Sequence, residues 1–282
     1  MEKIGLLLDS TALTRDDIRS HAFIKIASLG VTIDGVDYKE TEVPQEKMIS
    51  FLHTAKKMST SQPAPGEFLH LFEQYRSEGY THVLVVVLSD KISGTFQAAV
   101  IAKTMVDFPL HIEILSPQVA SFGVALGVPP LVQMIKAGES FKAVVERARS
   151  LYADAKVMFT LADLMHLFRG GRLNRVSALI GTVLRIKPII EMIDGKLQLT
   201  RRERTNLACY EYFLTTIDHY REKHRKVAVD VIQMNRLEWA DRMVDAITKK
   251  YPDIEIHRTI YISPVFYVHL GDQGFGIALT GE

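Results

Sequence analysis

The sequence predicts an α/β protein with two domains: an N-terminal domain with a mainly parallel sheet flanked by helices, and a C-terminal α/β (α+β) domain. In the first half, short apolar runs such as 83–88 alternate with longer amphipathic segments, as expected when strands are covered on both faces of a parallel sheet. The second half mixes strand-like and helical segments less regularly. Since 282 residues suffice for two domains of ordinary size, we place them at 1–155 and 156–282.

The N-terminal elements follow from this alternation. Three apolar runs are predicted strands: 4–8, 83–88 and 112–115. Four segments with a helical period are predicted helices: 65–75, 95–106, 121–135 and 140–153. Pro65 suits a first helical position and Ser140 suits an N-cap. The order of these elements indicates βαβ units with right-handed crossovers.

The second half is interpreted in the same way. Strands are expected at 157–160, around Ile189 and Leu197, at 227–233 and at 254–260. Helices are expected at 205–222 and 236–251, and Gly170-Gly171 is expected to form a turn.

Composition limits the class of protein. An apolar share of 47%, a charged share of 24% and a net charge of +1 are typical of a soluble globular protein. Cys209 is the single cysteine, so no intramolecular disulfide can form, which suits a reducing compartment. The longest apolar run has six residues, whereas a membrane-spanning helix needs about 20. The N-terminus is too short for a signal-peptide core, so we expect a cytoplasmic protein.

Several catalytic signatures do not occur in the sequence. It has no G-x-x-x-x-G-K-[ST], G-x-G-x-x-G, H-E-x-x-H or G-x-S-x-G motif. Asp163 and His166 form the closest approach to a metal-ligand pair, but no further ligands follow at a suitable spacing. We therefore predict no metal.

Two hydroxyl-rich segments are the strongest candidates for a binding site. TSQPAPGEF (60–68) and SGTFQAA (93–99) are each predicted as a turn before a helix. Helix starts carry free N–H groups and the positive end of the helix dipole, which favours bound anions. Ser93 follows the most apolar strand, and Gly94 allows close backbone approach. Thr60 and Ser61 could instead serve only as turn or cap residues.

LDST (8–11) ends the first predicted strand, at the edge of the sheet where open α/β sheets bind ligands. Asp9 and Ser10 could contact a ligand there. Equally, either could cap a helix that begins near Thr14 or Arg15.

A basic segment extends from Arg169 to Arg204, with nine Lys or Arg residues and three acidic ones. It includes RGGRL (169–173), RIKPII (185–190) and TRRER (200–204). Such a segment could contact phosphate or an acidic protein surface, or form a solvated basic face. Nucleic acid is a weaker candidate partner, because no aromatic residues are interleaved with these cations.

These motifs, in this order, resemble the DegV family of bacterial fatty-acid-binding proteins, which includes the FakB subunits of fatty acid kinase. The resemblance covers essentially the whole chain. It rests on LDST, TSQPAPGEF, LSDKISGTFQAA (88–99), RGGRL, IKPII (186–190), Asp194-Gly195 with RRER (201–204), and the segment around His269.

The resemblance implies a fatty-acid carrier that is not catalytic alone and uses no cofactor. A long-chain fatty acid would lie in a buried tunnel between or within the domains, and an ATP-dependent kinase subunit would phosphorylate its carboxylate to an acyl phosphate. Thr60, Ser61, Ser93 and His269 would bind the carboxylate. Arg169, Arg172 and Arg202 would face the kinase or the phosphate. No nucleic-acid partner is implied, and transient contact with a membrane is compatible with this role.

The sequence departs from the family near its C-terminal end. The family pattern is close to G-P-V-x-G-T-H-x-G-P-G, and here residues 263–273 read SPVFYVHLGDQ. His269 and Gly271 remain, but Phe266 and Tyr267 add bulk. We expect the tunnel or the headgroup site to be reshaped.

Two alternatives belong to other functional classes. The first is an acyl or lipid hydrolase with Ser93 as nucleophile, His269 as base and Asp9 as the group that orients the base; the missing nucleophile elbow argues against it. The second is a regulatory or structural module that binds nucleic acid through the basic segment.

Overall fold

A four-stranded parallel sheet forms the centre of the N-terminal half. The computed structural model describes residues 2–14, 16–173, 186–258 and 262–282. The sheet order is β2-β1-β6-β7, with β1 at Ile4–Asp9, β2 at Ile24–Ala27, β6 at His82–Val86 and β7 at His111–Leu115. In the register of the two central strands, Leu8 of β1 lies beside Val86 of β6, so the segments that follow both strands emerge at the same edge.

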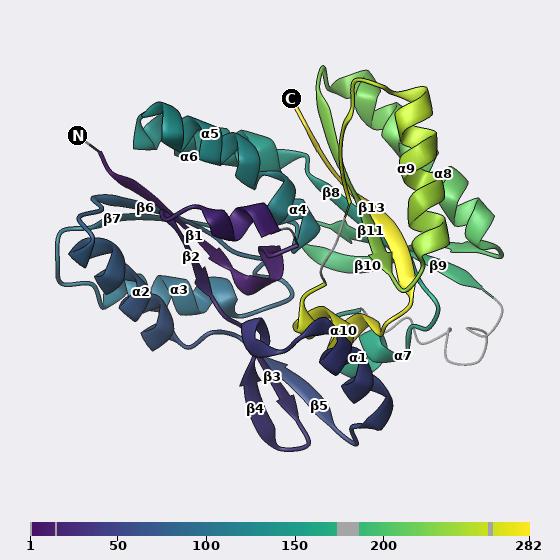
Figure 1. The fold of residues 1–282 in the computed structure, drawn as a ribbon, viewed down its shortest axis with the longest axis horizontal. Helices are drawn as coiled ribbons and strands as arrows, with labels where there is room; N and C mark the ends of the chain where they lie inside the picture. Colours follow the sequence, from purple (N-terminus) through teal and green to yellow (C-terminus); the bar gives the residue numbers. More distant parts are fainter. Residues whose placement is uncertain (1, 15, 174–185, 259–261) are drawn as a thin grey trace.

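Helices cover both faces of this sheet (Figure 1). They are α2 (Pro65–Ser77), α3 (Thr95–Thr104), α4 (Phe122–Leu126), α5 (Val128–Ala137) and α6 (Phe141–Ala153). Leu7 packs in one core with Phe72 of α2, whereas Leu6 and Leu8 join a second core that includes α4 to α6. Because successive strand side chains point to opposite faces, an unbroken apolar run supplies both cores.

A small sheet projects from this layer. Its order is β4-β3-β5, with β3 at Gly30–Ile33, β4 at Val36–Lys39 and β5 at Met58–Ser61. The 3₁₀ turn η3 (Glu40–Glu42) and helix α1 (Gln45–Thr54) connect β4 to β5. The sequence pattern does not predict this unit, because its strands have four residues each and are partly exposed.

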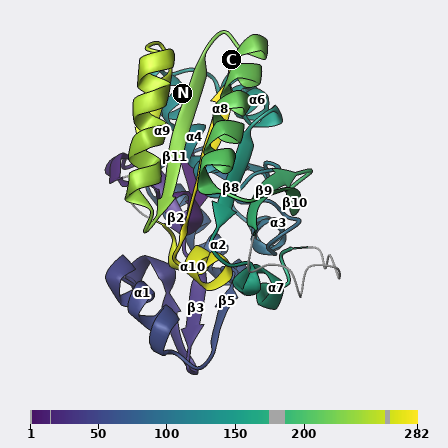
Figure 2. The ribbon, with the colours of Figure 1, turned by 90° about the vertical axis from the view of Figure 1, so that its right-hand side faces the viewer.

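The second half forms a mixed six-stranded sheet of order β10-β9-β8-β13-β11-β12. Its strands are β8 (Lys156–Leu161), β9 (Lys187–Ile193), β10 (Lys196–Glu203), β11 (Val227–Met234), β12 (Glu255–Arg258) and β13 (Gly274–Gly281). Helices α8 (Asn206–Lys223) and α9 (Leu237–Lys250) cover its outer face (Figure 2). Its other face shares a core with the N-terminal half, where Phe159 and Ile232 pack with Leu8.

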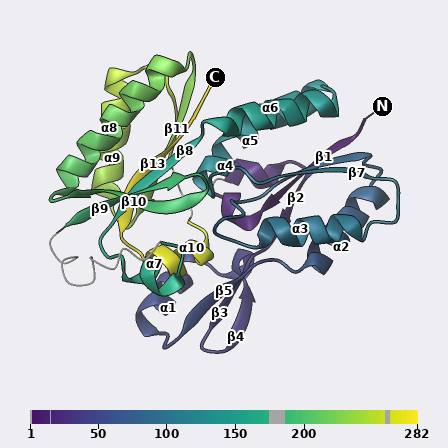
Figure 3. The same ribbon diagram turned by 180° about the vertical axis from the view of Figure 1, so that it is seen from behind.

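Two short helices lie between this sheet and the small one (Figures 1 and 3). They are α7 (Met165–Gly170) and α10 (Pro264–Leu270), which pack against each other and, through α10, against α1 and β5. Neither was predicted as a helix. The Gly170-Gly171 turn instead ends α7, with Gly171 in the left-handed conformation at φ 69°.

The predicted α/β class, with a parallel sheet flanked by helices and a further mixed sheet, is confirmed. The predicted domain boundary lies between α6 and β8. The single helix predicted at 121–135 is wrong, since Gly127 separates α4 from α5 before Pro129 and Pro130. Arg185 and the last two residues of the strand predicted at 254–260 lie outside the described residues. Among the helices described, none is long and apolar enough to span a membrane.

Candidate functional site

Three segments that are distant in sequence meet around one cavity of about 210 Å³. They are the end of β5, the loop between β6 and α3, and helix α10. We call this space the hydroxyl cavity. It is lined by Leu29, Thr60, Ser61, Gln62, Leu88, Ile92, Ser93, Gly94, Arg172, Leu197, Val265, Phe266, His269 and Leu270. All four residues predicted to bind a carboxylate are in this set.

Thr60 and His269 are hydrogen-bonded to each other. Thr60 lies in β5 opposite Val31 of β3, and its Oγ1 is 2.9 Å from Nε2 of His269, in the last turn of α10. Thr60 and Ser61 therefore lie in a strand, so the turn predicted at these two residues was wrong, whereas the helix expected after them begins at Pro65. Ser61, the next residue, lies opposite Gly30, where an added Cβ would be 2.4 Å from Ser61 Oγ.

His269 is held in its neutral form. Burial lowers its pKa from 6.5 to about 4, and the charge of Arg172 and the nearby His166 add to this shift. Its Nδ1 is buried without a hydrogen-bond partner among the described residues. A neutral imidazole that carries its proton on Nε2 donates to Thr60 Oγ1. The Thr60 hydroxyl hydrogen is then free to donate to an anion in the cavity.

Ser93 is oriented by the first turn of α3. Its Oγ lies 2.9 Å from Thr95 Oγ1 and accepts a longer bond of 3.4 Å from the Thr95 N–H. The Gln62 side chain lies close to Gly94, since an added Cβ there would lie 2.2 Å from Gln62 Oε1. This contact places the end of β5 beside the Ser93 loop.

The LDST motif supports the site and does not line it. Asp9 accepts hydrogen bonds from the Thr11 N–H and, at 2.6 Å, from the Leu88 N–H. It caps the 3₁₀ turn η1 (Ser10–Ala12), not a helix at Thr14. Ser10 donates to Glu40 and accepts from the Leu29 N–H. These contacts favour a structural role for Asp9 and Ser10 over direct contact with a ligand.

The Asp194-Gly195 turn supports the Ser93 loop from the second half. Buried Ser89 donates to the Gly195 carbonyl oxygen at 2.9 Å. Gly195 has a φ of 76°, and an added Cβ would lie 2.4 Å from Ser89 Oγ. The β9–β10 turn thus contacts the N-terminal half at the base of the loop that carries Ser93.

The hydrolase arrangement of Ser93, His269 and Asp9 is not supported. Ser93 bonds Thr95, His269 bonds Thr60, and Asp9 bonds Thr11 and Leu88. A nucleophilic serine needs hydrogen bonding from serine to base and from base to carboxylate. Here the three side chains have separate partners.

A small apolar cavity adjoins the hydroxyl cavity. It measures about 30 Å³ and is lined mainly by apolar side chains of both halves, including Phe122, Phe159, Met192 and Met234. The two cavities share four lining residues: Ile92, Leu197, Phe266 and Leu270. Phe266, which departs from the family pattern, therefore lies where the polar and apolar spaces meet. Tyr267, the second bulky departure, is 1% exposed in the adjoining core.

On its other side, the hydroxyl cavity adjoins a basic opening. This second space, about 410 Å³, shares Thr60, Arg172 and His269 with the hydroxyl cavity. Apart from His269, five basic residues line it, and we call them the basic mouth: Lys56, Lys57, His166, Arg169 and Arg172. Within the described residues, no carboxylate forms an ion pair with its lysines or arginines.

The basic mouth includes two of the three predicted arginines. Arg172 donates to the carbonyl oxygens of Gly170, at 2.7 Å, and Ile92, at 3.4 Å, and so connects α7 to the Ser93 loop. Arg202 is exposed on β10 and does not line this opening. Lys56 and Lys57 were missed, because only the fold of β3 to β5 brings them beside α7.

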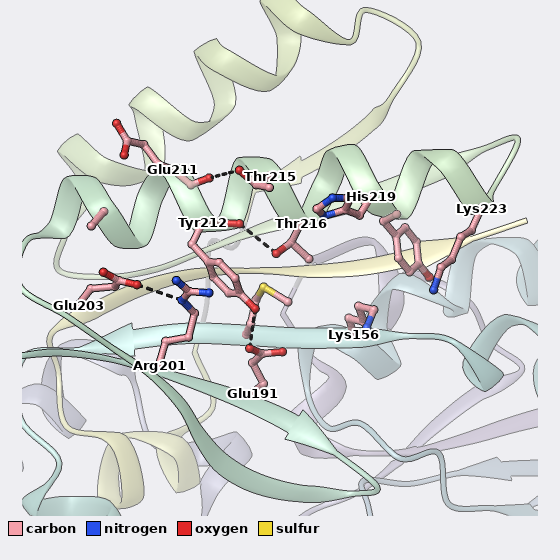
Figure 4. Close-up of a pocket in the computed structure, with 13 residues that line it drawn as sticks. Lys156, Glu191, Arg201, Glu203, Glu211, Tyr212, Thr215, Thr216, His219 and Lys223 are labelled. Carbon is pink, nitrogen blue, oxygen red and sulfur yellow. Dashed lines mark hydrogen bonds and ion pairs between the residues drawn. The ribbon is translucent and has the colours of Figure 1, made fainter.

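A larger groove of about 600 Å³ lies elsewhere, between α8 and strands β8 to β10 (Figure 4). Several of its polar and charged groups are paired with each other. Arg201 bonds Glu203 at 3.0 Å, and the Tyr212 hydroxyl donates to Glu191 at 3.0 Å. None of the predicted site residues lines this groove.

Known proteins match this chain over nearly its whole length. A family model described as "Uncharacterised protein, DegV family" matches residues 3–282. The chain belongs to the DegV family. A DegV domain-containing protein of Listeria monocytogenes is 29% identical over 280 residues, 98% of each chain. Another, from Staphylococcus aureus, is 27% identical over 280 residues, 99% of each chain.

Solved DegV structures have the same fold. A Bacillus subtilis structure, described as DegV, a fatty acid binding protein, has a TM-score of 0.89 at 27% identity and covers 100% of both chains. A Thermus thermophilus structure, described as fatty acid binding of a DegV family protein, has a TM-score of 0.90 at 25% identity. It covers 99% of this chain and 100% of that one.

Proposed function

We propose that this DegV protein binds a long-chain fatty acid and presents its carboxylate to an ATP-dependent kinase subunit, which phosphorylates it to an acyl phosphate. One observation carries the proposal: a cavity lined by hydroxyls and a neutral histidine is bounded by an apolar space on one side and a cationic opening on the other. Solved relatives described as fatty acid binding share the fold around it.

Affinity would come from the acyl chain. Burial contributes about 0.8 kcal/mol per methylene, on the order of 10 kcal/mol gross for a long chain. The apolar cavity of about 30 Å³ has roughly the volume that one water occupies in the liquid. Binding would therefore displace the side chains that line it, and Met192 and Met234 are unbranched and adaptable.

Orientation would come from neutral donors. Thr60 and Ser93 would each donate a hydroxyl hydrogen to the carboxylate, and Nε2 of His269 would hold the Thr60 oxygen. Neutral donors suit a carboxylate that must remain nucleophilic, because a bidentate arginine would bind its charge more tightly and weaken its attack on phosphorus.

The basic mouth would act on the partner side. Phosphoryl transfer depends on positioning and on positive charge near the transferred group. Arg169 and Arg172 lie beside the hydroxyl cavity, and no carboxylate among the described residues forms an ion pair with either of them. We propose that they face the phosphate or an acidic surface of the kinase, and that Arg202 contributes from the neighbouring surface of β10. The carrier itself would catalyse no step.

Native mass spectrometry of protein purified from bacteria tests the first half of this proposal. We expect a co-purified fatty acid, and saturable binding of oleate or palmitate after delipidation. Ser93→Ala should weaken binding by about ten- to a hundredfold, since one hydrogen bond to a charged acceptor contributes about 1.5–3 kcal/mol. Ser150→Ala, which changes an exposed serine of α6, is the matched control. An empty protein that fails to bind either acid would refute carrier function.

The second half is tested by kinase assay. Loaded protein, a bacterial fatty acid kinase subunit and ATP should give acyl phosphate, trapped as the hydroxamate. Arg169→Gln should lower the rate while fatty-acid binding changes little, because Arg169 lines the basic opening and not the hydroxyl cavity. An unchanged rate for Arg172→Gln and Arg169→Gln together would contradict the assignment of the basic mouth.

A further inference from the structure

A buried carboxyl group outside the cavity connects two of its walls. Glu40, in η3, is 1% exposed and lines none of the three spaces described above. One carboxylate oxygen accepts from the Ser10 hydroxyl. The other accepts from the Ser263 hydroxyl and, at 3.1 Å, from the Val265 N–H. Three donors from two other segments thus converge on this one side chain.

The first wall is Leu29. Its N–H donates to Ser10 Oγ at 2.9 Å, and its carbonyl oxygen accepts from the Glu40 N–H at 2.9 Å. Leu29 is therefore held on both sides by Glu40 and by the serine that Glu40 binds. Its side chain lines the hydroxyl cavity.

The second wall is α10. Ser263 precedes the helix and Val265 lies in its first turn, so Glu40 holds the start of α10. The same seven-residue helix supplies four lining residues of the hydroxyl cavity: Val265, Phe266, His269 and Leu270. A movement at the start of such a short helix carries all four side chains with it.

We propose that Glu40 is a positioning residue for the binding site: it fixes α10, and with it His269, against the β3 side of the cavity. Buried carboxyls are costly unless they are fully hydrogen-bonded. Burial indeed raises the pKa of Glu40, and the neighbouring Asp9 carboxyl adds to this shift. A core residue needed only for packing would be apolar at this position. The two carboxylate oxygens of Glu40 instead supply the acceptors that the Ser10, Ser263 and Val265 donors need.

The test compares Glu40→Met with Glu42→Met. Methionine keeps the length of the side chain and removes every acceptor, whereas Glu42 is an exposed acid of the same turn. In Glu40→Met, α10 loosens and water reaches His269. We expect the His269 pKa, followed by NMR in the ligand-free protein, to rise from about 4 toward 6.5. Oleate affinity should fall about tenfold, as for a buried donor left unpaired. Glu42→Met should change neither quantity.

Two further variants test whether the acceptors of Glu40 position α10. Glu40→Gln retains an acceptor that can face Ser263 and Val265, so it should restore most of the His269 shift. Ser263→Ala removes one of the two α10 contacts and should change both quantities in the same direction by a smaller factor. If Glu40→Met does not fold, Ser263→Ala decides, and an unchanged His269 titration with unchanged affinity overturns the inference.

The oleate measurement rests on the proposed function, but the His269 titration does not. If the wild-type protein binds no fatty acid, the proposed function fails, and the NMR comparison still tests Glu40. If the wild-type protein binds oleate and a folded Glu40→Met variant matches it in both measurements, only the positioning role fails.

Discussion

Gly170 offers a way to disturb the site without disturbing the fold. It ends α7 beside His269, and an added Cβ would lie 2.4 Å from Nδ1 and 3.2 Å from Cε1 of the imidazole. Ordinary contact begins near 3.4 Å, so Gly170→Ala requires the ring to move by about 1 Å. The backbone of Gly170 is not in the left-handed region, and alanine is therefore accepted there without strain.

The size of the effect follows from the Thr60–His269 hydrogen bond. That bond is 2.9 Å long, and hydrogen bonds of this kind extend only to about 3.2 Å. A shift of about 1 Å breaks it, at a net cost of about 1 kcal/mol, and leaves the Thr60 hydroxyl unoriented. Each 1.4 kcal/mol corresponds to about a factor of ten in Kd. We expect fatty-acid affinity to fall about five- to tenfold.

Titration calorimetry with delipidated protein and oleate measures this change, and thermal unfolding measures stability in parallel. A glycine-to-alanine change stabilises the folded protein by about 0.4–1 kcal/mol, because alanine restricts the unfolded chain. This gain offsets the loss of the hydrogen bond, so the melting temperature should change little. Gly66→Ala in α2 is the control, because an added Cβ there meets nothing within 4 Å. Wild-type oleate affinity in Gly170→Ala would refute the role assigned to the His269 position.

Two further predictions concern stability. His269 has a pKa of about 4 in the fold and about 6.5 when unfolded. Between these pH values the unfolded chain binds more protons than the folded one. The stability that neutral His269 contributes is therefore complete above pH 6.5 and is lost as pH falls to 4, by about 3 kcal/mol. Denaturant titrations should show His269→Gln losing less stability than wild type over this range, and parallel curves would contradict the low pKa. Ser89→Ala should cost about 1–3 kcal/mol, because the Gly195 carbonyl loses a buried donor; a loss no larger than that of Ser150→Ala, by the same titration, would contradict a stabilising contact between the halves.

The parts of the site that the sequence revealed are those whose signal is local. Ser93 was identified because an unbroken apolar strand precedes it and Gly94 follows it, and the local pattern alone places that loop at the edge of the sheet. Thr60 was assigned to the site but to the wrong local structure. The strand that carries it has four residues, none of them buried, and its pairing with β3 provides the order that the segment lacks by itself.

The remaining parts depend on contacts between distant segments. His269 and Thr60 are 209 residues apart, and no local pattern connects them; the family resemblance provided that link. Lys56 and Lys57 join the basic mouth only because the small sheet places them beside α7. Glu40 had no sequence signal, since one glutamate in a polar stretch resembles any exposed acid until its burial is known.

The position of β13 has a consequence for folding. This strand lies between β8 and β11 in the six-stranded sheet, although it follows every other strand of that sheet in sequence. The centre of the sheet therefore cannot close until β13 is in place. One edge of β8 can pair early with β9, but its other edge pairs with a strand more than a hundred residues downstream. Non-local pairing of this kind slows folding. Since α10 directly precedes β13, the sheet and the cavity are completed in the same late folding step. An acyl chain that binds afterwards would stabilise the fully folded protein.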